Sequence, residues 1–398
     1  MRGIRVVDVS RMQAGPLATM MLGDLGADVI KVEQTGKGDL MRRIGIHYLG
    51  PENTYFLSVN RSKRSVAVDF RSPEGLALVR RLTRSADVFV ENFRPGTVNE
   101  MGLDDATLRA ENPRLVYCSV SAFGQTGPLS HQPGLDPVLQ GFSGMMSMTG
   151  EPGRPPVRTG AATIDTMTAM LAAQAIAMAL FERERSGLGQ KVELSLLNSA
   201  LWMLIPREGP YFATGQIPTR EGYAHPQHVP HQVFETQDGW ISVITNSDER
   251  WRRLCEALGH PEWGEDPRYA TSKLRLQRRD EVIALISPTF KERPTAAWVE
   301  ILERHDVLHG LVNDVAEALS HPQVLHNEMV VSQQHPTAGT VRTLGIPMRF
   351  DRTPGRPVSP PPLLGEHTDE VLRELGIGQA ELADLHARGI VARAPSPQ

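Results

Sequence analysis

Short apolar runs alternate with helix-like segments through the first half of the chain, and this alternation most constrains the fold. Residues 4–9 are typical of a buried strand, residues 16–25 of a helix, and residues 28–33 of a second strand. A strand, a helix and a strand in this order form a βαβ unit, whose two strands are parallel and whose helix covers one face of the sheet. The sequence therefore predicts an α/β fold with a parallel sheet.

The same alternation continues to about residue 197, which favours a doubly wound sheet with helices on both faces. Further strands are expected at 65–70, 87–91, 115–119 and 191–197. The longest predicted helix covers the apolar run 167–181, which is rich in Ala, Leu and Met, all strong helix formers. Gly187 and Gly189 are expected to end it.

A chain of 398 residues is too long for one ordinary core, so we expect two domains. We place a large domain at 1–205, a linker rich in Pro, Gly and His at 206–232, a small domain at 233–330, and a C-terminal segment at 331–398. The expected elements beyond the linker are a hairpin at 233–245, helices at 248–258, 280–286 and 296–304, a strand at 341–350, and helices at 367–375 and 379–388.

The composition bears on partners and compartment. A net charge of −4 argues against a nucleic-acid or membrane-surface partner, and we expect no apolar run long enough to span a membrane. The first residues enter a strand directly, without the apolar region of a signal peptide. Cys118 and Cys255 are far apart in sequence and are expected to be small core residues. These features favour a reduced, cytoplasmic compartment.

One acid, Asp165, lies at the entry to the long apolar helix. A carboxylate there is typical of a helix cap or first-turn acid, which faces the positive end of the helix dipole. The same carboxylate could be a nucleophile, because it is ionised at neutral pH and needs no general base. Both interpretations remain open from the residues, since a helix end can also position a nucleophile.

Two other kinds of site are disfavoured. Glu33 ends the second strand as a ribose-binding acid would, but the first turn, Gln13-Ala14-Gly15-Pro16, lacks the G-x-G-x-x-G pattern of nicotinamide and flavin sites. Three histidines lie at 225, 228 and 231, but prolines interrupt them, so loop histidines are expected there and no metal site. Lys63 and Arg64 are typical either of a solvated surface or of a phosphate-binding patch.

Several blocks, in the same order, resemble class III CoA-transferases of the CaiB/BaiF type, a family that includes formyl-CoA transferase and α-methylacyl-CoA racemase. The blocks are VSRMQAGPLATMMLGDLGADVIKVE, NRSKRSVAVDFRSPEG, DVFVENFRPG, SAFGQTGP, GLDPVLQGFSGMMSMTG, TGAATIDTMTAM and GQKVELSLLNSALW. The resemblance covers essentially the whole chain and is weaker beyond about Gly259.

The resemblance implies a role for each matching residue. Asp165 matches the catalytic aspartate of the family. The implied CoA-binding residues are Gln13, Ala14, Lys63, Arg64, Asn92, Phe93, Arg94 and Asp136. No tightly bound cofactor and no metal are implied, and coenzyme A and acyl-CoA enter as substrates together with carboxylic acids.

The chain also departs from the family pattern. Gln34 and Glu100 stand where formyl-CoA transferase has arginines, so Lys37, Arg42 or Arg43 would have to replace two contacts to the CoA phosphates. Leu135 stands where the racemases have a histidine that carries a proton. Because an alkyl side chain carries no proton, racemisation by that mechanism is disfavoured.

The resemblance further implies a Rossmann-like large domain built from both chain ends, a smaller α+β domain between them, and two chains interlocked in a homodimer. It implies that Asp165 attacks an acyl-CoA thioester, and that an aspartyl anhydride and then an aspartyl-CoA thioester carry CoA to a second acid. The alternatives are a racemase-type isomerase and a non-catalytic homologue that binds CoA esters.

Overall fold

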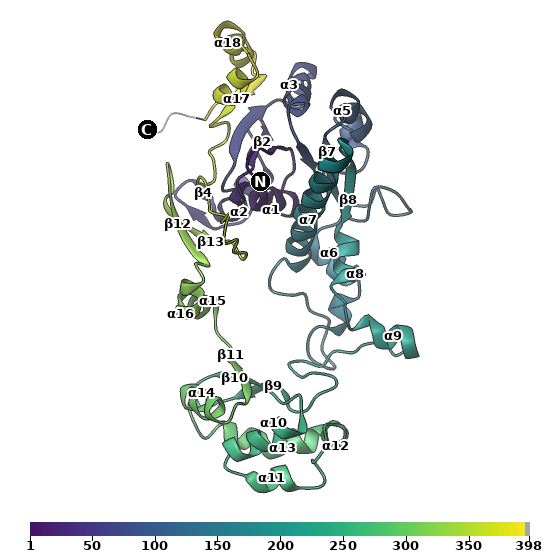
Figure 1. The fold of residues 1–398 in the computed structure, drawn as a ribbon, viewed down its shortest axis with the longest axis vertical. Coiled ribbons are helices and arrows are strands. Elements are labelled where there is room, and N and C mark those ends of the chain that lie inside the picture. Colours follow the sequence, from purple (N-terminus) through teal and green to yellow (C-terminus); the bar gives the residue numbers. More distant parts are fainter. Residues whose placement is uncertain (395–398) are drawn as a thin grey trace. The chain divides into compact units, whose positions relative to one another are not determined.

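The computed structural model describes residues 1–394 and divides into two compact units (Figure 1). The large unit comprises Met1–Met145, Thr159–Pro206 and the chain from Pro322 onward, and the small unit comprises Met146–Arg158 and Arg207–His321. These units differ from the predicted boundaries at the linker. Residues 207–232 belong to the small unit, and residues 322–330 belong to the large one.

A seven-stranded sheet lies at the centre of the large unit, in the order β14-β5-β2-β1-β6-β7-β8. Its strands are β1 (Arg5–Asp8), β2 (Asp28–Gln34), β5 (Arg64–Val68), β6 (Val88–Glu91), β7 (Val116–Ser121), β8 (Lys191–Ser195) and β14 (Val391–Ala392). The first six are parallel to one another, and β14 is antiparallel to β5. The predicted α/β class and parallel sheet are therefore confirmed.

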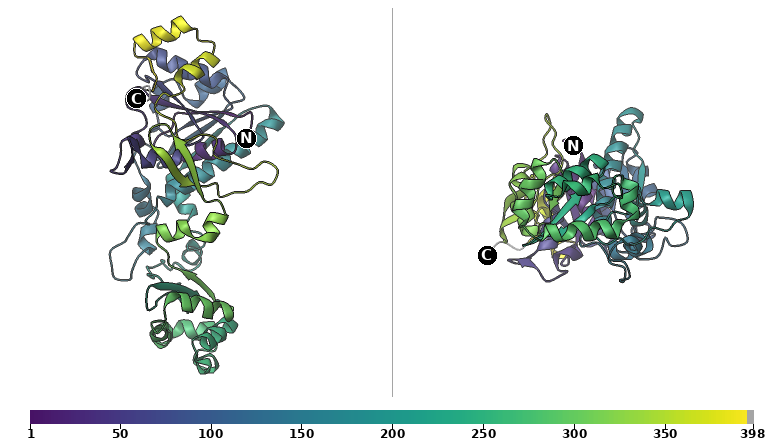
Figure 2. Two further views of the ribbon diagram at one scale, coloured as in Figure 1. Left: turned by 90° about the vertical axis from the view of Figure 1, so that its left-hand side faces the viewer. Right: turned by 90° about the horizontal axis from the view of Figure 1, so that it is seen from below.

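Helices cover both faces of this sheet, because successive strand residues point to opposite sides. Val6 and Val88 pack with α1 and α7, whereas Val7 and Phe89 pack with α3, α5, α17 and α18. The bounds of these helices are α1 (Ala14–Asp24), α3 (Pro73–Arg84), α5 (Asp105–Glu111), α7 (Thr163–Ser186), α17 (Thr368–Glu374) and α18 (Gln379–Ala387). Figure 2 shows α17 and α18, in yellow, on the same side of the sheet as α3.

Helix α7 has 24 residues, and Gly187, in a left-handed conformation, ends it as predicted. Among the helices within residues 1–394, it is the one whose length and composition would allow it to cross a membrane. This result differs from the sequence expectation, because the helix extends past the run 167–181 at both ends. A core helix passes the same test, and α7 packs on α1 and the sheet with Ala172 and Ile176 fully buried.

The chain leaves the two central strands in opposite directions. From β1 it passes through α1 to β2, and from β6 it passes through α5 to β7 on the other side. Ligands of open parallel sheets bind beside the carboxyl ends of the strands at such a reversal. The loops that follow Asp8 and Glu91 are therefore the expected place for a ligand.

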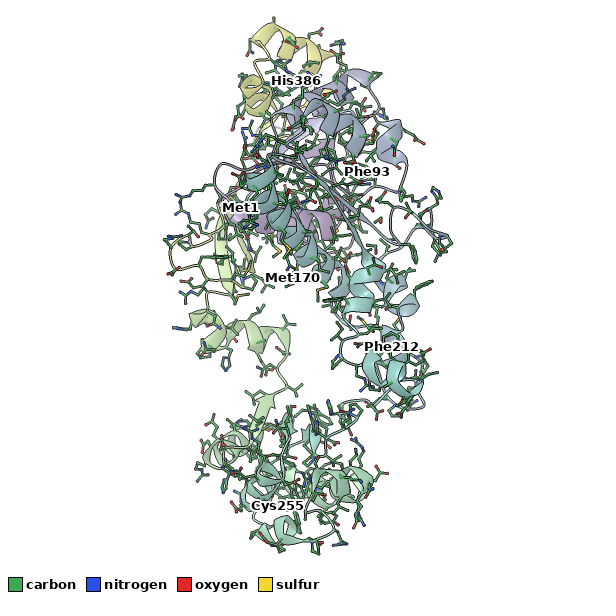
Figure 3. The ribbon with its side chains drawn as sticks, turned by 45° about the vertical axis from the view of Figure 1, so that its right-hand side comes forward. Met1, Phe93, Met170, Phe212, Cys255 and His386 are labelled. Carbon is green, nitrogen blue, oxygen red and sulfur yellow. The ribbon has the colours of Figure 1, made fainter. Side chains whose placement is uncertain are left out.

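The small unit contains a three-stranded antiparallel sheet and a helical layer. The sheet order is β11 (Leu308–Leu311), β10 (Trp240–Ile244), β9 (His231–Glu235), and the main helices are α10 (Asp248–Ala257), α13 (Arg279–Phe290) and α14 (Thr295–Arg304). The predicted hairpin and all three predicted helices are present. Trp251 and Trp298 fill the core together with Cys255, which Figure 3 labels. Cys255 and Cys118 are both buried and free.

Two sequence expectations about irregular segments were inaccurate. The predicted strand at 341–350 ends at Leu344, after which Pro347, which has no N–H to donate, follows in an extended segment. The predicted linker contains a short helix that Gly215 ends in a left-handed conformation.

The remaining elements are η1 (Leu40–Arg42), β3 (Tyr48–Leu49), β4 (Glu52–Asn53), α2 (Thr54–Val59), α4 (Thr97–Glu100), α6 (Asp136–Phe142), η2 (Met145–Met148), α8 (Leu196–Trp202), α9 (Glu208–Thr214), α11 (Pro261–Glu265), α12 (Ser272–Gln277), α15 (Val315–Ser320), α16 (Pro322–His326), β12 (Val330–His335) and β13 (Gly339–Leu344).

Candidate active site

Asp165 is the third residue of α7, and it does not cap its own helix. The cap comes from Asp136 at the start of α6, whose Oδ2 accepts the backbone N–H groups of Ile164 (2.7 Å) and Asp165 (3.1 Å). Asp136 is buried and satisfies N–H groups that a helix start leaves without partners. Within residues 1–394 the Asp165 carboxylate itself accepts no hydrogen bond, so it is available for chemistry.

The surroundings of Asp165 make its ionised form less stable than in water. Burial, and then the negative charge of Asp136, raise the pKa of Asp165 to about 6. At neutral pH the carboxylate is therefore ionised but poorly solvated, and water competes less for its lone pairs. Such a carboxylate is suited to attack an electrophilic carbon.

Gln140 completes the support of this helix start, and the sequence reasoning did not include it. Its side-chain amide donates to Asp136 Oδ1 (2.5 Å) and to Thr159 Oγ1 (2.9 Å), and its oxygen accepts the N–H of Thr159 (2.9 Å). Gln140 is fully buried and lies one helical turn after Asp136 on α6. That spacing of four residues is the signal that could have found it, because such residues share a helix face.

The structure brings Gln13 to the same helix start. Gln13 precedes α1, and its side-chain amide donates to Thr166 Oγ1 at 3.5 Å, next to Asp165 in the chain. Ala14, the first residue of α1, is buried in the contact between α1 and α7. The predicted pair Gln13 and Ala14 therefore lies beside the predicted nucleophile.

Asn92 joins the two loops at the strand-order reversal. Its Oδ1 accepts the N–H of Arg11 (2.8 Å), and its Nδ2 donates to the carbonyl of Arg11 (2.7 Å). The Arg11 guanidinium lies 4.5 Å from the centre of the Phe93 ring, a cation–π contact. These contacts fix the turn after β1 against the turn after β6.

Two cavities open at this edge of the sheet, and Phe93, which Figure 3 labels, lines both. The larger, about 500 Å³, also contains Asn92, Arg94 and the half-exposed side chain of Leu135. The smaller, about 280 Å³, lies over the ends of β1 and β2 and includes Arg11 and aromatic Phe70. Adjacent cavities of this size suit a long ligand with an aromatic end.

Glu91 holds the loop that carries Asn92 and Phe93, and it too was missed from the sequence. Its Oε2 accepts the N–H of Phe93 (2.8 Å), and Ser119 donates its hydroxyl to Oε1. Burial raises the pKa of Glu91 to about 7, and the two hydrogen bonds only partly oppose this effect. The sequence signal that could have identified Glu91 is an acidic residue at the end of an apolar strand.

Lys63 does not lie where a phosphate could reach it, and this placement argues against the predicted CoA contact. Its side chain is fully buried, and its ammonium group donates to Asp8 Oδ2 (3.1 Å), the Pro16 carbonyl (2.8 Å) and Asn60 Oδ1 (2.9 Å). Those three partners use all three ammonium protons. Lys63 therefore supports the turn at the start of α1 from inside.

Arg64 is engaged in a separate ion-pair group. It binds Asp28 at the start of β2 (2.7 Å) and Glu374 of α17 (2.6 Å), away from the carboxyl ends of the strands. The structure thus does not bring Arg64 together with Asn92 and Phe93.

The structure separates the three cations proposed to replace the missing arginines. Arg42 forms a two-bond pair with Glu33 (2.8 Å each) and lies over the Phe56 ring, so its charge is already compensated. Lys37 and Arg43 are exposed, and neither forms an ion pair within the described chain, residues 1–394. They remain available for phosphates, as does exposed Arg94.

Comparison with known proteins gives this arrangement a family. A sequence model described as CoA-transferase family III matches residues 1–368. Succinyl-CoA:glutarate CoA-transferase of Mus musculus is 40% identical over 375 residues, covering 94% of this chain and 86% of the mouse protein. Succinate–glutarate CoA-transferase of Agrobacterium fabrum is 39% identical over 379 residues, covering 94% and 95% of the two chains.

Solved structures agree with the sequence comparison. A CAIB/BAIF family protein from Brucella suis has a TM-score of 0.86 and 37% identity, and the match covers 94% of this chain and 98% of that one. A protein from Mycobacterium tuberculosis has a TM-score of 0.83 and 30% identity, with 93% and 98% covered. The match in sequence and in fold spans the carboxylate, its supporting helix and both cavities, and this protein accordingly belongs to CoA-transferase family III and is a CoA-transferase.

Proposed function

We propose that this enzyme moves CoA from a dicarboxylic acyl-CoA, such as succinyl-CoA, to a free dicarboxylic acid, such as glutarate, with Asp165 as the nucleophile. The names of the mouse and Agrobacterium relatives support this choice of substrates. The observation that carries the catalytic assignment is the Asp165 carboxylate, which is half-buried, bears no hydrogen bond within residues 1–394, and is held in place through Asp136.

The proposed reaction proceeds without an added proton donor. An Asp165 oxygen attacks the thioester carbonyl carbon, the carbon–sulfur bond breaks, and CoA leaves as the thiolate. The thiolate then attacks the Asp165 acyl carbon, which forms the aspartyl-CoA thioester and releases the donor acid as its carboxylate. The acceptor carboxylate attacks that thioester, which expels CoA again as the thiolate and forms a second aspartyl anhydride. The thiolate then attacks the acceptor acyl carbon of this anhydride, which yields the acceptor acyl-CoA and restores the Asp165 carboxylate.

The negative charge on the attacked carbonyl oxygen needs a hydrogen-bond donor. The first N–H groups of α7 are already used, because those of Ile164 and Asp165 bind Asp136 and that of Thr163 binds the Ala161 carbonyl. We assign the donor role to the side-chain amide of Gln13, which lies beside Thr166.

We place the nucleotide end of CoA in the smaller cavity and its flexible arm in the larger one. Phe93 and Phe70 offer aromatic surfaces to the adenine, and Phe93 is shared by the two cavities. Exposed Lys37, Arg43 and Arg94 are the cations that we assign to the phosphates.

The test combines product analysis with trapping of the enzyme intermediate. Succinyl-CoA and glutarate are expected to yield glutaryl-CoA and succinate in equal amounts, measured by mass spectrometry. Succinyl-CoA alone, followed by hydroxylamine, is expected to leave a hydroxamate on Asp165, because aspartyl anhydrides and thioesters are both acyl donors. Absence of CoA exchange across a panel of mono- and dicarboxylic acids would reject the substrate class, and exchange without any Asp165 adduct would reject the mechanism.

Asp136→Asn is expected to move the acid limb of the pH–rate profile to lower pH. The pKa of Asp165 is about 6 partly because of the Asp136 charge, so loss of that charge keeps the nucleophile ionised further into the acid range. An asparagine oxygen can still accept the two N–H groups. The measurement is kcat/KM from about pH 4.5 to pH 8.

The control for this experiment is Asp105→Asn, which removes a first-turn acid from α5 instead of α6. Its profile is expected to match that of the wild type. If the acid limb of the pH–rate profile of Asp136→Asn stays in place or moves to higher pH, the Asp136 charge does not act on the nucleophile.

We also propose that the enzyme is an interlocked homodimer, as the family resemblance implies. The outer face of α7 supports an apolar partner surface, since Met170 (labelled in Figure 3), Met178 and Phe181 are each at least half exposed. Sedimentation of a diluted, folded sample is expected to show a dimer, and a folded monomer would contradict the proposal.

A further inference from the structure

The turn between β1 and α1 contains a residue in a strained backbone conformation. Met12 has a φ of 67°, in the left-handed region, where a residue with a Cβ atom is disfavoured. Gln13, which we assign as the donor to the attacked carbonyl oxygen, follows it directly in the chain. Strained residues persist only where their surroundings hold them, and they gather at functional sites. The contacts that hold Met12 therefore bear on catalysis.

The residues on both sides of this pair are fixed to other elements. Arg11 is held through its backbone, because Asn92 accepts its N–H (2.8 Å) and donates to its carbonyl (2.7 Å). Ala14 is buried in the contact between α1 and α7. Because the chain is fixed on both sides, a change of φ at Met12 must be compensated at Gln13, and the Gln13 side chain then points in another direction.

A buried carboxylate from the loop after β2 holds Met12 itself. Asp39 Oδ1 accepts the N–H of Met12 (3.1 Å) and that of Met41 (3.0 Å). Its Oδ2 accepts the ammonium group of Lys31 (2.9 Å), which also donates to the Ser10 carbonyl (3.0 Å) at the start of the turn. The side chains of Asp39 and Lys31 are both fully buried, so water does not compete for these contacts. The ion pair therefore supports the turn from the interior.

We propose that Asp39 is a positioning residue for CoA transfer, which holds Met12 in its left-handed conformation and thereby directs the Gln13 amide at the carbonyl oxygen. A hydrogen bond from an N–H to a buried carboxylate is comparable in free energy with the cost of one left-handed residue, so this one contact can decide the conformation. The inference rests on the proposed function, because that function assigns Gln13 its role.

The alternative is that Asp39 serves the binding of CoA, since it lies in the wall of the smaller cavity. The two roles affect different kinetic constants. A misdirected Gln13 lowers kcat, because the negative charge on the carbonyl oxygen develops only in the transition state. A damaged cavity wall raises the KM for the acyl-CoA, because it weakens binding of the ground state as well.

Two substitutions of Asp39 in the full-length enzyme separate position from stability. Asp39→Ala is expected to lower kcat for transfer from succinyl-CoA to glutarate by about 10- to 100-fold and to leave both KM values unchanged. Asp39→Asn retains an oxygen that can accept the Met12 N–H, and its kcat is expected to stay close to that of the wild type. Both variants lose the charge that pairs with Lys31, so both are expected to have a lower unfolding midpoint.

A pair of substitutions at Met12 tests the backbone conformation. Met12→Gly and Met12→Ala both remove the side chain beyond Cβ, but glycine adopts a positive φ readily and alanine does not. In the Asp39→Ala background, kcat of Met12→Gly is expected to exceed that of Met12→Ala by about 5- to 30-fold. With Asp39 present, the difference is expected to have the same direction and to be smaller, because the hydrogen bond holds either residue in the turn.

Glu328 provides the matched control, since it too is a non-glycine residue with a positive φ, 56°. It is exposed and precedes β12, outside the candidate site. Glu328→Gly and Glu328→Ala are expected to differ in unfolding midpoint and to share the kcat of the wild type. A second control uses Gln13→Ala, in which the two Met12 variants are expected to have equal kcat, because no amide remains to be directed.

The outcomes distinguish this inference from the proposed function. If the wild-type enzyme transfers no CoA from succinyl-CoA to glutarate or to any other acid, the proposed function fails. If it transfers CoA and the Met12 pair has equal kcat in the Asp39→Ala background, the positioning role of Asp39 is overturned. That role is also overturned if Asp39→Ala raises only the KM for the acyl-CoA. A difference between the Met12 variants that persists in Gln13→Ala would overturn the action through Gln13 and leave the proposed reaction in place.

Discussion

Asp165→Ala is expected to lower kcat/KM for CoA transfer by roughly 10⁴-fold or more while the protein stays folded and still binds CoA. A methyl group cannot form the anhydride or the thioester, so both halves of the reaction are lost. The fold is expected to tolerate the change, because within residues 1–394 the carboxylate accepts no hydrogen bond and Asp136 caps the helix. The measurement is product formation from succinyl-CoA and glutarate, with thermal unfolding of the same samples.

Glu381→Ala is the matched control, since Glu381 is an exposed acid in the first turn of α18. It is expected to have wild-type activity. A folded Asp165→Ala enzyme with activity within tenfold of the wild type would remove Asp165 as the nucleophile and leave only a structural role at the helix start.

Lys63→Met is expected to lower the free energy of unfolding by about 3 kcal/mol, the lower end of the usual cost of breaking a buried ion pair. Burial opposes ionisation of Asp8, but Lys63 and Lys31, together with hydrogen bonds from Ser10 and Thr19, outweigh it and hold the pKa of Asp8 at about 2. Burial lowers the pKa of Lys63 to about 8, so at pH 7 both partners are charged. With methionine at position 63, the buried Asp8 carboxylate keeps one neighbouring cation, Lys31, in place of two. Urea unfolding at pH 7 measures the loss as a lower midpoint.

The double variant Asp8→Asn with Lys63→Met removes both charges and is expected to be more stable than Lys63→Met alone. Lys37→Met, at an exposed position, is expected to change stability by less than about 0.5 kcal/mol. If Lys63 instead contacted a CoA phosphate, its loss would raise the KM for the acyl-CoA and leave the unfolding midpoint unchanged.

Helix α7 shows how far local sequence patterns can predict this fold. Its apolar run and Gly187 were sufficient to predict the helix and its end, because both signals lie within the helix. Its start at Thr163 was not predictable, because the cap is Asp136, which belongs to another helix and reaches the N–H groups through tertiary structure. Central strands such as β6 and β7 were predictable for the same reason as the apolar run, because each is a short and fully buried stretch.

The residues of the candidate site also differ in whether local sequence could identify them. Asp165 could be identified from the sequence because the family resemblance assigns it, whereas its place at the helix entry alone fits both a cap and a nucleophile. Gln140 and Glu91 were not identified, since their roles depend on partners such as Thr159 and Ser119 that the fold brings to them. A sequence shows that such residues are polar but not what they face.

Lys63 and Arg64 are the opposite case, because the sequence assigned them a ligand contact that their partners in the structure argue against. The motif places both near the start of a strand, and two adjacent cations are a common feature of phosphate sites. Neighbouring residues at a strand start point in different directions, however. One of these side chains enters the interior beneath α1, and the other reaches acids on β2 and α17.

The edge of β5 has a consequence for how the protein is made. Val391 of β14 pairs with Val68, Thr368 accepts the N–H of Ala67 (3.0 Å), and Gly365 donates to Ser65 (3.0 Å), so the last part of the chain closes this edge. On the ribosome, strands β1 to β8 emerge long before their covering segment exists. The nascent chain therefore carries an open strand edge and an uncovered apolar face until residues 365–392 have been translated. A stop codon before residue 365 would leave the proposed nucleophile Asp165 in place, yet the shortened chain is expected to be prone to aggregate.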